Sequence, residues 1–328
     1  MLYVNHSTSI GKYLAIGIVI ALSMVLNTAC QKEEFGPSIF IDTPQQQVPG
    51  SLTYAFDMYL HREFLKPYNL EFAYKLKDVT TDMDYNLVPA TLDNSKKLAV
   101  LVKYLWYDAY KNVAGSDFLK KYGPKLIVLI GSSGYNPANG TEILGLAEGG
   151  IKISLLKVNH IDVANVDMLN EYYFLTMHHE FAHILHQIKS YPADFNLISY
   201  KNYDPFTWQS KHDEIAWSMG FVSPYGSSQT QEDFVETIAH YITRTDEQWN
   251  TLLSKSEKEW IVDEQTGQLR ETTVYSDGIN GKAVILQKLN ICRVWLKSAW
   301  NIDIDKLRAE VQTRQANFDM QQLLSEIK

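Results

Sequence analysis

The sequence predicts an α+β fold, in which a small sheet lies over one long helix and a mostly helical C-terminal half follows. Two short apolar segments, residues 125–131 and 151–159, have the length and patterning of strands. Residues 166–189 carry a long helical period of apolar side chains, and helical periods dominate after residue 210. A chain of 328 residues, of which 45% are hydrophobic and 21% charged, can build a sizeable globular core.

The first thirty residues have the pattern of a secretion signal. Lys12 precedes an apolar run over residues 13–26, which is too short to span a membrane. The run leads through small residues to Cys30, as in the lipobox of bacterial lipoproteins, although Asn27 stands where that pattern places leucine. We expect residues 1–29 to be a lipoprotein signal peptide and Cys30 to be lipidated, with plain secretion as the alternative.

The segment after the signal is expected to be a flexible tether over residues 30–50, because it is polar and rich in proline. The stretch that begins at Gln31 resembles the acidic signal that sends some Gram-negative lipoproteins to the outer face of the outer membrane. We therefore expect an outer-membrane lipoprotein that faces the cell surface, or otherwise the periplasm. A net charge of −8 and the lack of a basic block argue against a nucleic-acid partner.

The folded domain is expected to span residues 51–328. We divide it into an N-terminal subdomain at about 51–190 and a helical C-terminal subdomain at about 191–328. Apolar periodicity predicts that the first subdomain begins with a helix at 51–66, which ends at a proline. A second helix is predicted at 95–113.

Two strands are expected to follow these helices. Residues 125–131 form a continuous apolar run, which is typical of a buried strand, and segment 131–140 is rich in turn residues and predicts a loop. Residues 151–159 begin with alternating polar and apolar side chains, as in a strand with one wet face or in an edge strand, and we expect this strand to be the edge at which a substrate docks. An extended peptide could add to that edge, where a glycine pair leaves the backbone uncovered. The residues expected to contact such a peptide are Gly150, Ile151, Lys152 and Ile153.

The C-terminal half is predicted to be almost entirely helical. The long helix at 166–189 is followed by a loop to about residue 210, a short helix and a stretch rich in glycine and serine. Cys292 lies in an apolar helical run and is expected to be a buried thiol. The periodic segments predict helices at 231–243, 247–259, 280–300 and 303–325.

Residues 179–183 of the long helix read His-Glu-Phe-Ala-His. Histidines four residues apart lie one above the other on a helix, where both imidazoles can bind one tetrahedral Zn²⁺. With Glu180 between them, this is the HExxH pattern of zinc hydrolases, and such a site needs a third protein ligand. His186 lies about 10 Å along the helix axis from His179, and His178 points about 100° away, so neither can share the metal.

A carboxylate from a later helix is the remaining option for the third ligand. Glu232 and Glu236 lie four residues apart on one helix face, and the chain between His183 and Glu232 is long enough for a loop and a return. Two glutamates at this spacing are ordinarily a solvated surface. The alternative carboxylate ligands are Asp204, Asp213 and Glu214.

Segment 223–236 resembles the lethal-factor-type gluzincins. In that class a Tyr-Gly pair precedes the zinc-binding glutamate by seven residues, and a second glutamate follows it by four. Tyr225, Glu232 and Glu236 match these positions. More broadly, the histidine motif, the stretch 135–150 and this segment are similar to a family of zinc metallohydrolase lipoproteins, which are encoded beside outer-membrane nutrient import systems.

The resemblance, together with the spacing, implies a zincin-like fold and one Zn²⁺ per chain, bound by His179, His183 and Glu232. Glu180 would be the general base, which takes a proton from water and passes it to the leaving amine. Tyr225 would donate a hydrogen bond to the oxyanion of the reaction, unless it only packs a turn.

Glu236 and His240 are expected to orient a ligand imidazole, with an ordinary exposed carboxylate as the alternative for Glu236. The expected function is a zinc metallopeptidase with a peptide or peptide-like substrate, held at the membrane and associated with outer-membrane import proteins. Two other classes remain open, namely a non-catalytic binding subunit of an import complex and a hydrolase of glycan-linked amides or esters. Glu180 argues against the first, because a binding scaffold needs only the ligands.

Overall fold

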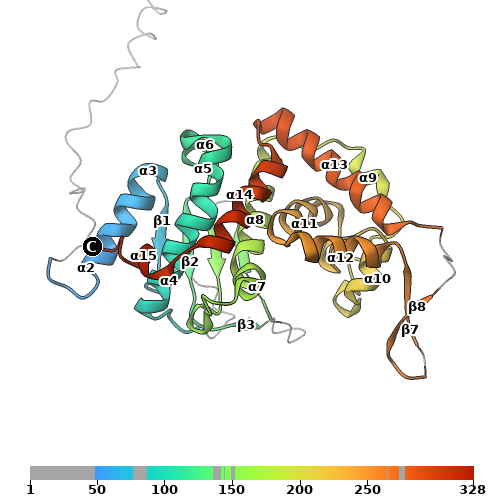
Figure 1. The fold of residues 1–328 in the computed structure, drawn as a ribbon, viewed down its shortest axis with the longest axis horizontal. Coiled ribbons are helices and arrows are strands. Elements are labelled where there is room, and N and C mark those ends of the chain that lie inside the picture. The colour runs from blue at the N-terminus through green and yellow to red at the C-terminus, as the bar shows by residue number, and fades with distance from the viewer. Residues whose placement is uncertain are drawn as a thin grey trace, which may run out of the picture. The chain divides into compact units, whose positions relative to one another are not determined.

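The structure is a computed structural model of the chain. Residues 47–328 form one compact unit (Figure 1). Within the described residues, no helix is both long enough and apolar enough to cross a membrane. The expected signal peptide and Cys30 lie outside the described residues, as do Gly150 and Ile151. The structure describes residues 49–76, 87–135, 142–143, 145–148, 152–263, 265–272 and 278–328.

A four-stranded sheet has the strand order β1-β2-β6-β5. Strands β1, β2 and β6 run parallel to one another, and β5 runs antiparallel to β6. The predicted buried strand at 125–131 is confirmed as β2, which has neighbours on both sides. Part of the predicted loop at 131–140 instead pairs as the short strand β3 with β4. The strands are β1 (Glu71–Ala73), β2 (Leu126–Leu129), β3 (Gly134–Tyr135), β4 (Glu142–Ile143), β5 (Gly145–Glu148) and β6 (Lys152–Leu155).

The prediction that residues 151–159 form the edge strand is wrong. Ile153 of β6 lies opposite Ile127 of β2 on one side and opposite Ala147 of β5 on the other. Lys152 and Ile153 are therefore interior to the sheet, and β5 is its edge in the described part of the chain. The alternation of polar and apolar side chains did not mark a wet face here, because the polar Ser154 is buried as well. It carries no information on the lateral neighbour with which the strand forms hydrogen bonds.

The two long helices of the N-terminal half each contain a π-helical segment. The first ends where Asn69 adopts the left-handed conformation with φ 53°. The second begins after Thr91, whose hydroxyl accepts the backbone N–H of Asn94, a few residues earlier than predicted. Helix α6 (Ser116–Tyr122) follows where no helix was predicted. The segments are α2 (Tyr54–Leu60), η1 (His61–Leu65) and α3 (Lys66–Tyr68), then α4 (Leu92–Leu101), η3 (Val102–Tyr107) and α5 (Asp108–Ala114).

The predicted helix at 166–189 is confirmed as one continuous helix. Its apolar face packs on aromatic side chains, since the Phe181 ring lies 5.1 Å from the rings of both Trp106 and Tyr110. His178 shares this side, with Nδ1 3.1 Å from the Tyr110 hydroxyl. At 3.6 residues per turn, this packing turns the histidines of the HExxH motif to another side of the helix. The segments are α7 (Val166–Leu169), η5 (Asn170–Phe174) and α8 (Leu175–Ile188).

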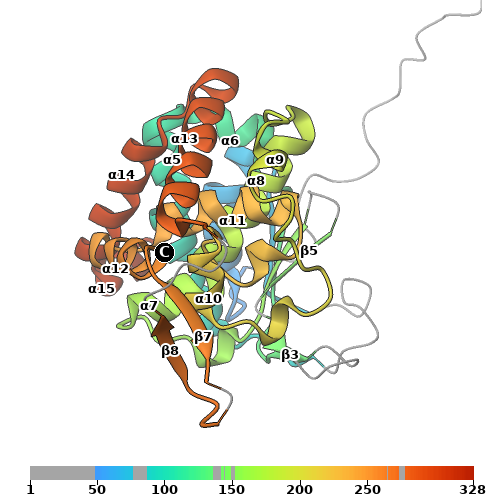
Figure 2. The ribbon, with the colours of Figure 1, turned by 90° about the vertical axis from the view of Figure 1, so that its right-hand side faces the viewer.

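The C-terminal half is mostly helical, as predicted, but a β-hairpin interrupts it. The predicted helix 247–259 ends at Ser256, and β7 begins at Glu259. Strand β7 pairs with β8 in a hairpin that projects beyond the helices (Figures 1 and 2). The predicted helix 303–325 is broken near Phe318, after which the Asp319 carboxylate caps a separate short helix. The elements are α9 (Phe195–Ile198), α10 (Asp213–Ser218), α11 (Thr230–Thr243), α12 (Asp246–Ser256), β7 (Glu259–Val262), β8 (Leu269–Thr272), α13 (Gly281–Trp300), α14 (Ile304–Asn317) and α15 (Met320–Leu324).

Two contacts hold the helices of the two halves together. Helix α14 packs against both α5 and α11, and Arg314 Nη1 donates to the carbonyl of Tyr104 at 2.9 Å. Helix α8 packs along α11, and Figure 2 shows the two near the centre of the folded unit. Cys292 of α13 is a fully buried thiol, as predicted. The pair α8 and α11 is thus enclosed on several sides and can hold side chains rigidly.

Candidate metal centre

The HExxH motif faces helix α11. Asn170 Nδ2 donates to the carbonyl of Thr243 near one end of the pair, and His183 lies beside Glu232 near the other. Low residue numbers on one helix therefore meet high numbers on the other, so the two helices run in opposite directions. This packing places side chains at four-residue intervals on α8 against side chains at four-residue intervals on α11.

Three donor atoms converge between the helices. His179 Nε2 and His183 Nε2 are 3.2 Å apart, and Glu232 Oε2 lies 3.1 Å from the first and 3.2 Å from the second. Zinc bonds of about 2.0–2.1 Å in a tetrahedral shell separate neighbouring ligand atoms by about 3.3 Å. The three atoms therefore have the spacing of three corners of such a shell, and the donor set fits zinc.

Glu180 also borders this group. Donor atoms of His179, Glu180 and His183 all lie within 4.8 Å of one another. Glu232 is nonetheless the better third donor, because its Oε2 is within 3.2 Å of both histidine nitrogens. Glu180 then lies beside the centre and is not needed as a ligand.

Glu236 connects His179 to a chain of hydrogen bonds. Its Oε1 lies 2.6 Å from His179 Nδ1, while its Oε2 accepts the Ser223 hydroxyl at 2.5 Å and lies 3.1 Å from His240 Nε2. Arg244 Nε donates to His240 Nδ1 at 3.0 Å, so that nitrogen carries no proton and His240 donates through Nε2 to Glu236. Because His179 donates through Nδ1, its Nε2 lone pair is directed at the metal centre. The structure thus places Glu236 and His240 behind a ligand imidazole, both buried.

His183 has a partner that the sequence did not indicate. Its Nδ1 lies 2.9 Å from His186 Nε2. Burial, and then the neighbouring His183, lower the pKa of His186 to about 4, so His186 is neutral and its Nε2 can accept a hydrogen bond from His183 Nδ1–H. His186 is no ligand, as expected, but it orients one. Its spacing of three residues from His183 was the available signal.

The charges of the centre favour a bound cation. Burial lowers the pKa of His179, but hydrogen bonds with Glu232 and Glu236 outweigh burial and raise that pKa to about 10. Burial raises the pKa of Glu232, yet the two histidines hold it well below its ordinary value. Among the described residues, no lysine or arginine forms an ion pair with Glu232 or Glu236. The carboxylates therefore stabilise positive charge at this point, which favours the binding of a divalent cation.

Tyr225 lies beside the centre. It opens the short helix η7 (Tyr225–Ser227), and its ring lies 5.8 Å from the His179 ring at an interplanar angle of 23°. The centroid of the Trp208 ring lies 4.8 Å from that of the Tyr225 ring, and Tyr225 remains 37% exposed. Burial, followed by the charge of Glu232, raises the pKa of Tyr225, so its hydroxyl keeps a proton at neutral pH. Tyr225 also packs in a turn, and its role as an oxyanion donor stays a prediction.

The alternative carboxylate ligands have other surroundings. Asp204 accepts hydrogen bonds from Thr207, and Glu214 pairs with Lys255 at 3.0 Å. Asp213 lies at the wall of a pocket that His240 also lines. None of the three takes part in the group of donor atoms that includes His179. The side chains near the centre that sequence reasoning missed are Ser223, His186 and Arg244.

The fold and the site together define a class of protein: an α+β chain with two histidines and one glutamate arranged for a single cation, and a further glutamate beside it. A family model described as "putative zinc-binding metallo-peptidase" matches residues 52–305, and the chain belongs to that family. The expected zinc metallopeptidase family is thus confirmed. The lipid anchor and the lethal-factor-type assignment stay predictions.

A solved structure supports the same family. The crystal structure of a "putative zinc-binding metallo-peptidase" from Bacteroides caccae is 36% identical in sequence and has a TM-score of 0.67. The match covers 85% of this chain and 97% of that chain. No match was found among curated proteins. The mixed fold with a small sheet and a helical C-terminal half therefore agrees with that of a solved member of the class.

Proposed function

We propose that this chain is a zinc-dependent peptidase that cleaves amide bonds. The observation that carries the proposal is the triangle of His179 Nε2, His183 Nε2 and Glu232 Oε2, with sides of 3.1–3.2 Å. These three residues would hold the ion. When bound, zinc would polarise a substrate carbonyl and lower the pKa of a water molecule toward about 7.

The remaining side chains supply proton transfer and orientation. Glu180 would take a proton from the attacking water and pass it to the amine nitrogen that leaves. Tyr225 would donate its hydroxyl proton in a hydrogen bond to the oxygen on which negative charge develops. Glu236 and His186 would hold the two imidazoles so that Nε2 of each is presented to the ion.

Glu180 favours hydrolysis over a binding role without chemistry. A binding subunit that only retained a metal site would need His179, His183 and Glu232 and no further carboxylate. Glu180 nevertheless lies among the donor atoms within 4.8 Å, and its side chain is partly buried. A partly buried carboxylate that serves no ligand role costs free energy, which a catalytic function would explain.

The test is the variant Glu180→Gln, which keeps the size of the side chain and removes its basicity. We expect zinc content and thermal unfolding to match the wild type, while turnover falls by at least about 100-fold. Turnover is measured by mass spectrometry on a peptide library incubated with zinc-loaded protein. The matched control is Glu247→Gln, an exposed glutamate of α12. Equal turnover of Glu180→Gln and wild type would rule out this mechanism.

Tyr225→Phe separates the two roles of that tyrosine. Loss of one oxyanion donor typically lowers kcat by about 100- to 1000-fold, and KM should change little because the bond forms mainly in the transition state. The phenylalanine ring keeps the packing against Trp208 and His179. An unchanged kcat would leave Tyr225 as a packing residue of the turn before α11.

We also propose that the protein is a lipoprotein of the outer membrane, attached through Cys30 and acting beside an import system. The support is the apolar run before Cys30 and the stretch that follows it. Cys30→Ser should move the protein from the membrane fraction to the soluble fraction after a high-salt wash. Retention of Cys30→Ser in the washed membranes would require another anchor.

A further inference from the structure

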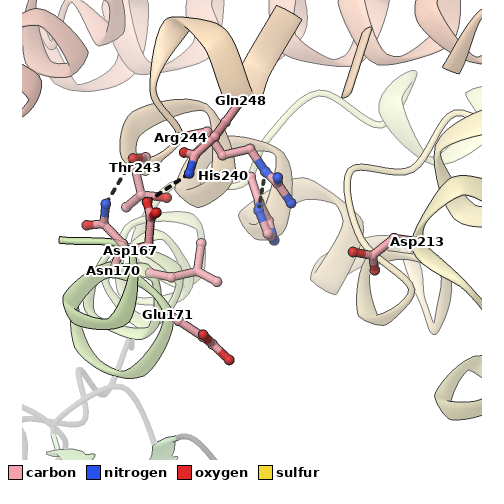
Figure 3. A pocket seen from close by; sticks show the side chains of 9 residues that line it. Asp167, Asn170, Glu171, Asp213, His240, Thr243, Arg244 and Gln248 are labelled. Atoms are coloured by element: carbon pink, nitrogen blue, oxygen red, sulfur yellow. Dashed lines mark hydrogen bonds between the residues drawn. The ribbon is translucent and has the colours of Figure 1, made fainter. Parts of the chain in front are cut away.

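A pocket of about 360 Å³ opens between η5, α10 and the C-terminal end of α11 (Figure 3). Its wall is shared with the metal centre, because His240 lines the pocket and also binds Glu236, the partner of His179. The lining residues are Asp167, Asn170, Glu171, Leu175, Asp213, His240, Thr243, Arg244 and Gln248.

The pocket lies within reach of a peptide bound at the metal centre. Leu175 lies four residues before His179 in α8, about 6 Å away along the helix axis at 1.5 Å per residue. Glu171 lies further back, in the π-helical segment η5. An extended peptide advances about 3.3 Å per residue, so a substrate residue about two positions from the cleaved bond would reach the pocket.

Arg244 is the cationic side chain of this pocket. Its Nε donates to His240 Nδ1, which fixes the plane of the guanidinium. Within the described part of the chain, its two terminal nitrogens make no hydrogen bond or ion pair, and Figure 3 shows the side chain at the pocket wall beside His240. A planar guanidinium with two free nitrogens matches a carboxylate, which can accept two parallel hydrogen bonds.

The acidic residues of the pocket limit what it can accept. The Asp167 carboxylate already accepts a hydrogen bond from Gln248. Glu171 and Asp213 are exposed, and Asp213 is close enough for its charge to act on both Arg244 and His240. Asp213, Asp167 and Glu171 make the lining negative apart from Arg244, and Asp213 acts directly on that arginine. A guest carboxylate is therefore stabilised only in direct contact with the Arg244 guanidinium.

We propose that this pocket is a substrate subsite in which Arg244 recognises one carboxylate of the peptide. The carboxylate can belong to the peptide C-terminus or to an aspartate or glutamate side chain. This inference rests on the proposed peptidase function and names the chemistry of the substrate that the centre would take. Arg244 is a specificity residue in this proposal, since the proton transfers are assigned to Glu180.

Binding is measured with zinc-loaded Glu180→Gln protein, so that no turnover is needed. One pair of N-acetylated hexapeptide pools differs only in a free or an amidated C-terminus. A second pair, amidated throughout, differs only in glutamate or glutamine at one position, which is moved along the peptide. Bound peptides are identified by mass spectrometry and their dissociation constants are determined by calorimetry. We expect one arm to favour the carboxylate by about 10- to 100-fold, the range of a charge-assisted hydrogen bond.

Adding Arg244→Gln to the same protein should bring this preference to about one, while Arg270→Gln, on the exposed β8 strand, should leave it unchanged. The preference is a ratio within one protein, so a general loss of affinity cancels. Zinc content is measured in parallel because Arg244 also contacts His240. The proposal would be overturned if the carboxylate preference survived Arg244→Gln. It would also be overturned if the Glu180→Gln protein with Arg244 intact showed no carboxylate preference with either pair of peptide pools.

Asp213→Asn gives a second test with the opposite sign. Asp213 is exposed at the start of α10, so the variant should fold even if Arg244→Gln does not. Removal of its negative charge should raise the carboxylate preference by about 2- to 5-fold, since rim charges act through a screened medium. A lower or unchanged preference would contradict the assigned electrostatics. Because binding is read without turnover, a protein that binds carboxylates but never hydrolyses peptides would refute the proposed function and keep this subsite.

Discussion

The two sides of helix α11 carry buried carboxylates in different surroundings. Asp233 and Glu232 are neighbours in the sequence, and both are buried. Asp233 Oδ2 accepts Lys288 Nζ from α13 at 2.7 Å and the Tyr203 hydroxyl at 2.7 Å. Among the described residues, Glu232 has only the imidazoles of His179 and His183 at ion-pair distance.

The difference lies in the source of positive charge. The chain itself supplies the cation to Asp233, because Lys288 is buried there and also donates to the carbonyl of Gly220 at 2.7 Å. Around Glu232 and Glu236, in the part of the chain that the structure describes, only histidines lie at ion-pair distance. A buried carboxylate needs a compensating charge. On one side of α11 the chain itself completes the ion pair, although Asp233 Oδ1 has no hydrogen-bond partner among the described residues. On the other side only histidines face the carboxylates, as the proposed metal site requires.

The largest effect is expected on the structural side. Lys288→Met keeps the length of the side chain and leaves the Asp233 carboxylate buried without its cation. Removing one partner of a buried pair costs about 3–5 kcal/mol of unfolding free energy. Urea denaturation of the zinc-free protein measures this loss. Zinc affinity, measured under conditions where the variant is folded, should stay within a few-fold of wild type.

Two controls sharpen that test. Lys282→Met removes a lysine of the same helix that pairs with exposed Glu257, and it should cost less than about 1 kcal/mol. Asp233→Leu combined with Lys288→Met removes both charges and should recover most of the lost stability. If Lys288→Met costs no more than Lys282→Met, the ion pair is not the structural element described here.

On the metal side, Glu232→Ala should weaken zinc binding by at least about 100-fold, more than the usual cost of losing a residue that only supports a ligand. The reason is the loss of one of three protein donors, which is also the carboxylate that lies within 3.2 Å of both Nε2 atoms. Competition with a chelator of known affinity gives the dissociation constant. Wild-type affinity in this variant would remove Glu232 from the ligand set and point to Glu180, which shares the donor group.

A smaller effect is expected one hydrogen bond further out. Glu236→Gln should weaken zinc binding by about 10- to 100-fold, because a glutamine cannot accept from His179, His240 and Ser223 at once. Ser223→Ala removes one donor to the same carboxylate and should cost less than Glu236→Gln in the same titration. Equal zinc affinity for Glu236→Gln and wild type would show that the tautomer of His179 does not depend on Glu236.

The candidate site was largely predictable because its residues repeat at helical spacing. His179 and His183 share one helix face, as do Glu232, Glu236 and His240 on the other helix. The structure brings all five together between α8 and α11. These relations are local to each helix, and only their meeting depended on the fold.

The errors concern relations across the sheet and between distant segments. The edge strand was assigned to residues 151–159, whereas β5 occupies that edge, because strand pairing joins segments that a periodic pattern cannot relate. The short elements β1, α6 and α9 and the hairpin of β7 and β8 gave no periodic signal long enough to recognise.

The sequence by itself determined the long helices and the faces on which the histidines and glutamates lie, because helix hydrogen bonds join residues only four apart. Tertiary structure alone decided that Lys288 is the cation of Asp233, although 55 residues separate them in the numbering. It also decided that Arg244 lines a pocket beside the candidate metal centre, with its Nε bound to His240. These partners come from elements far apart in the chain, and packing, rather than local geometry, selects them.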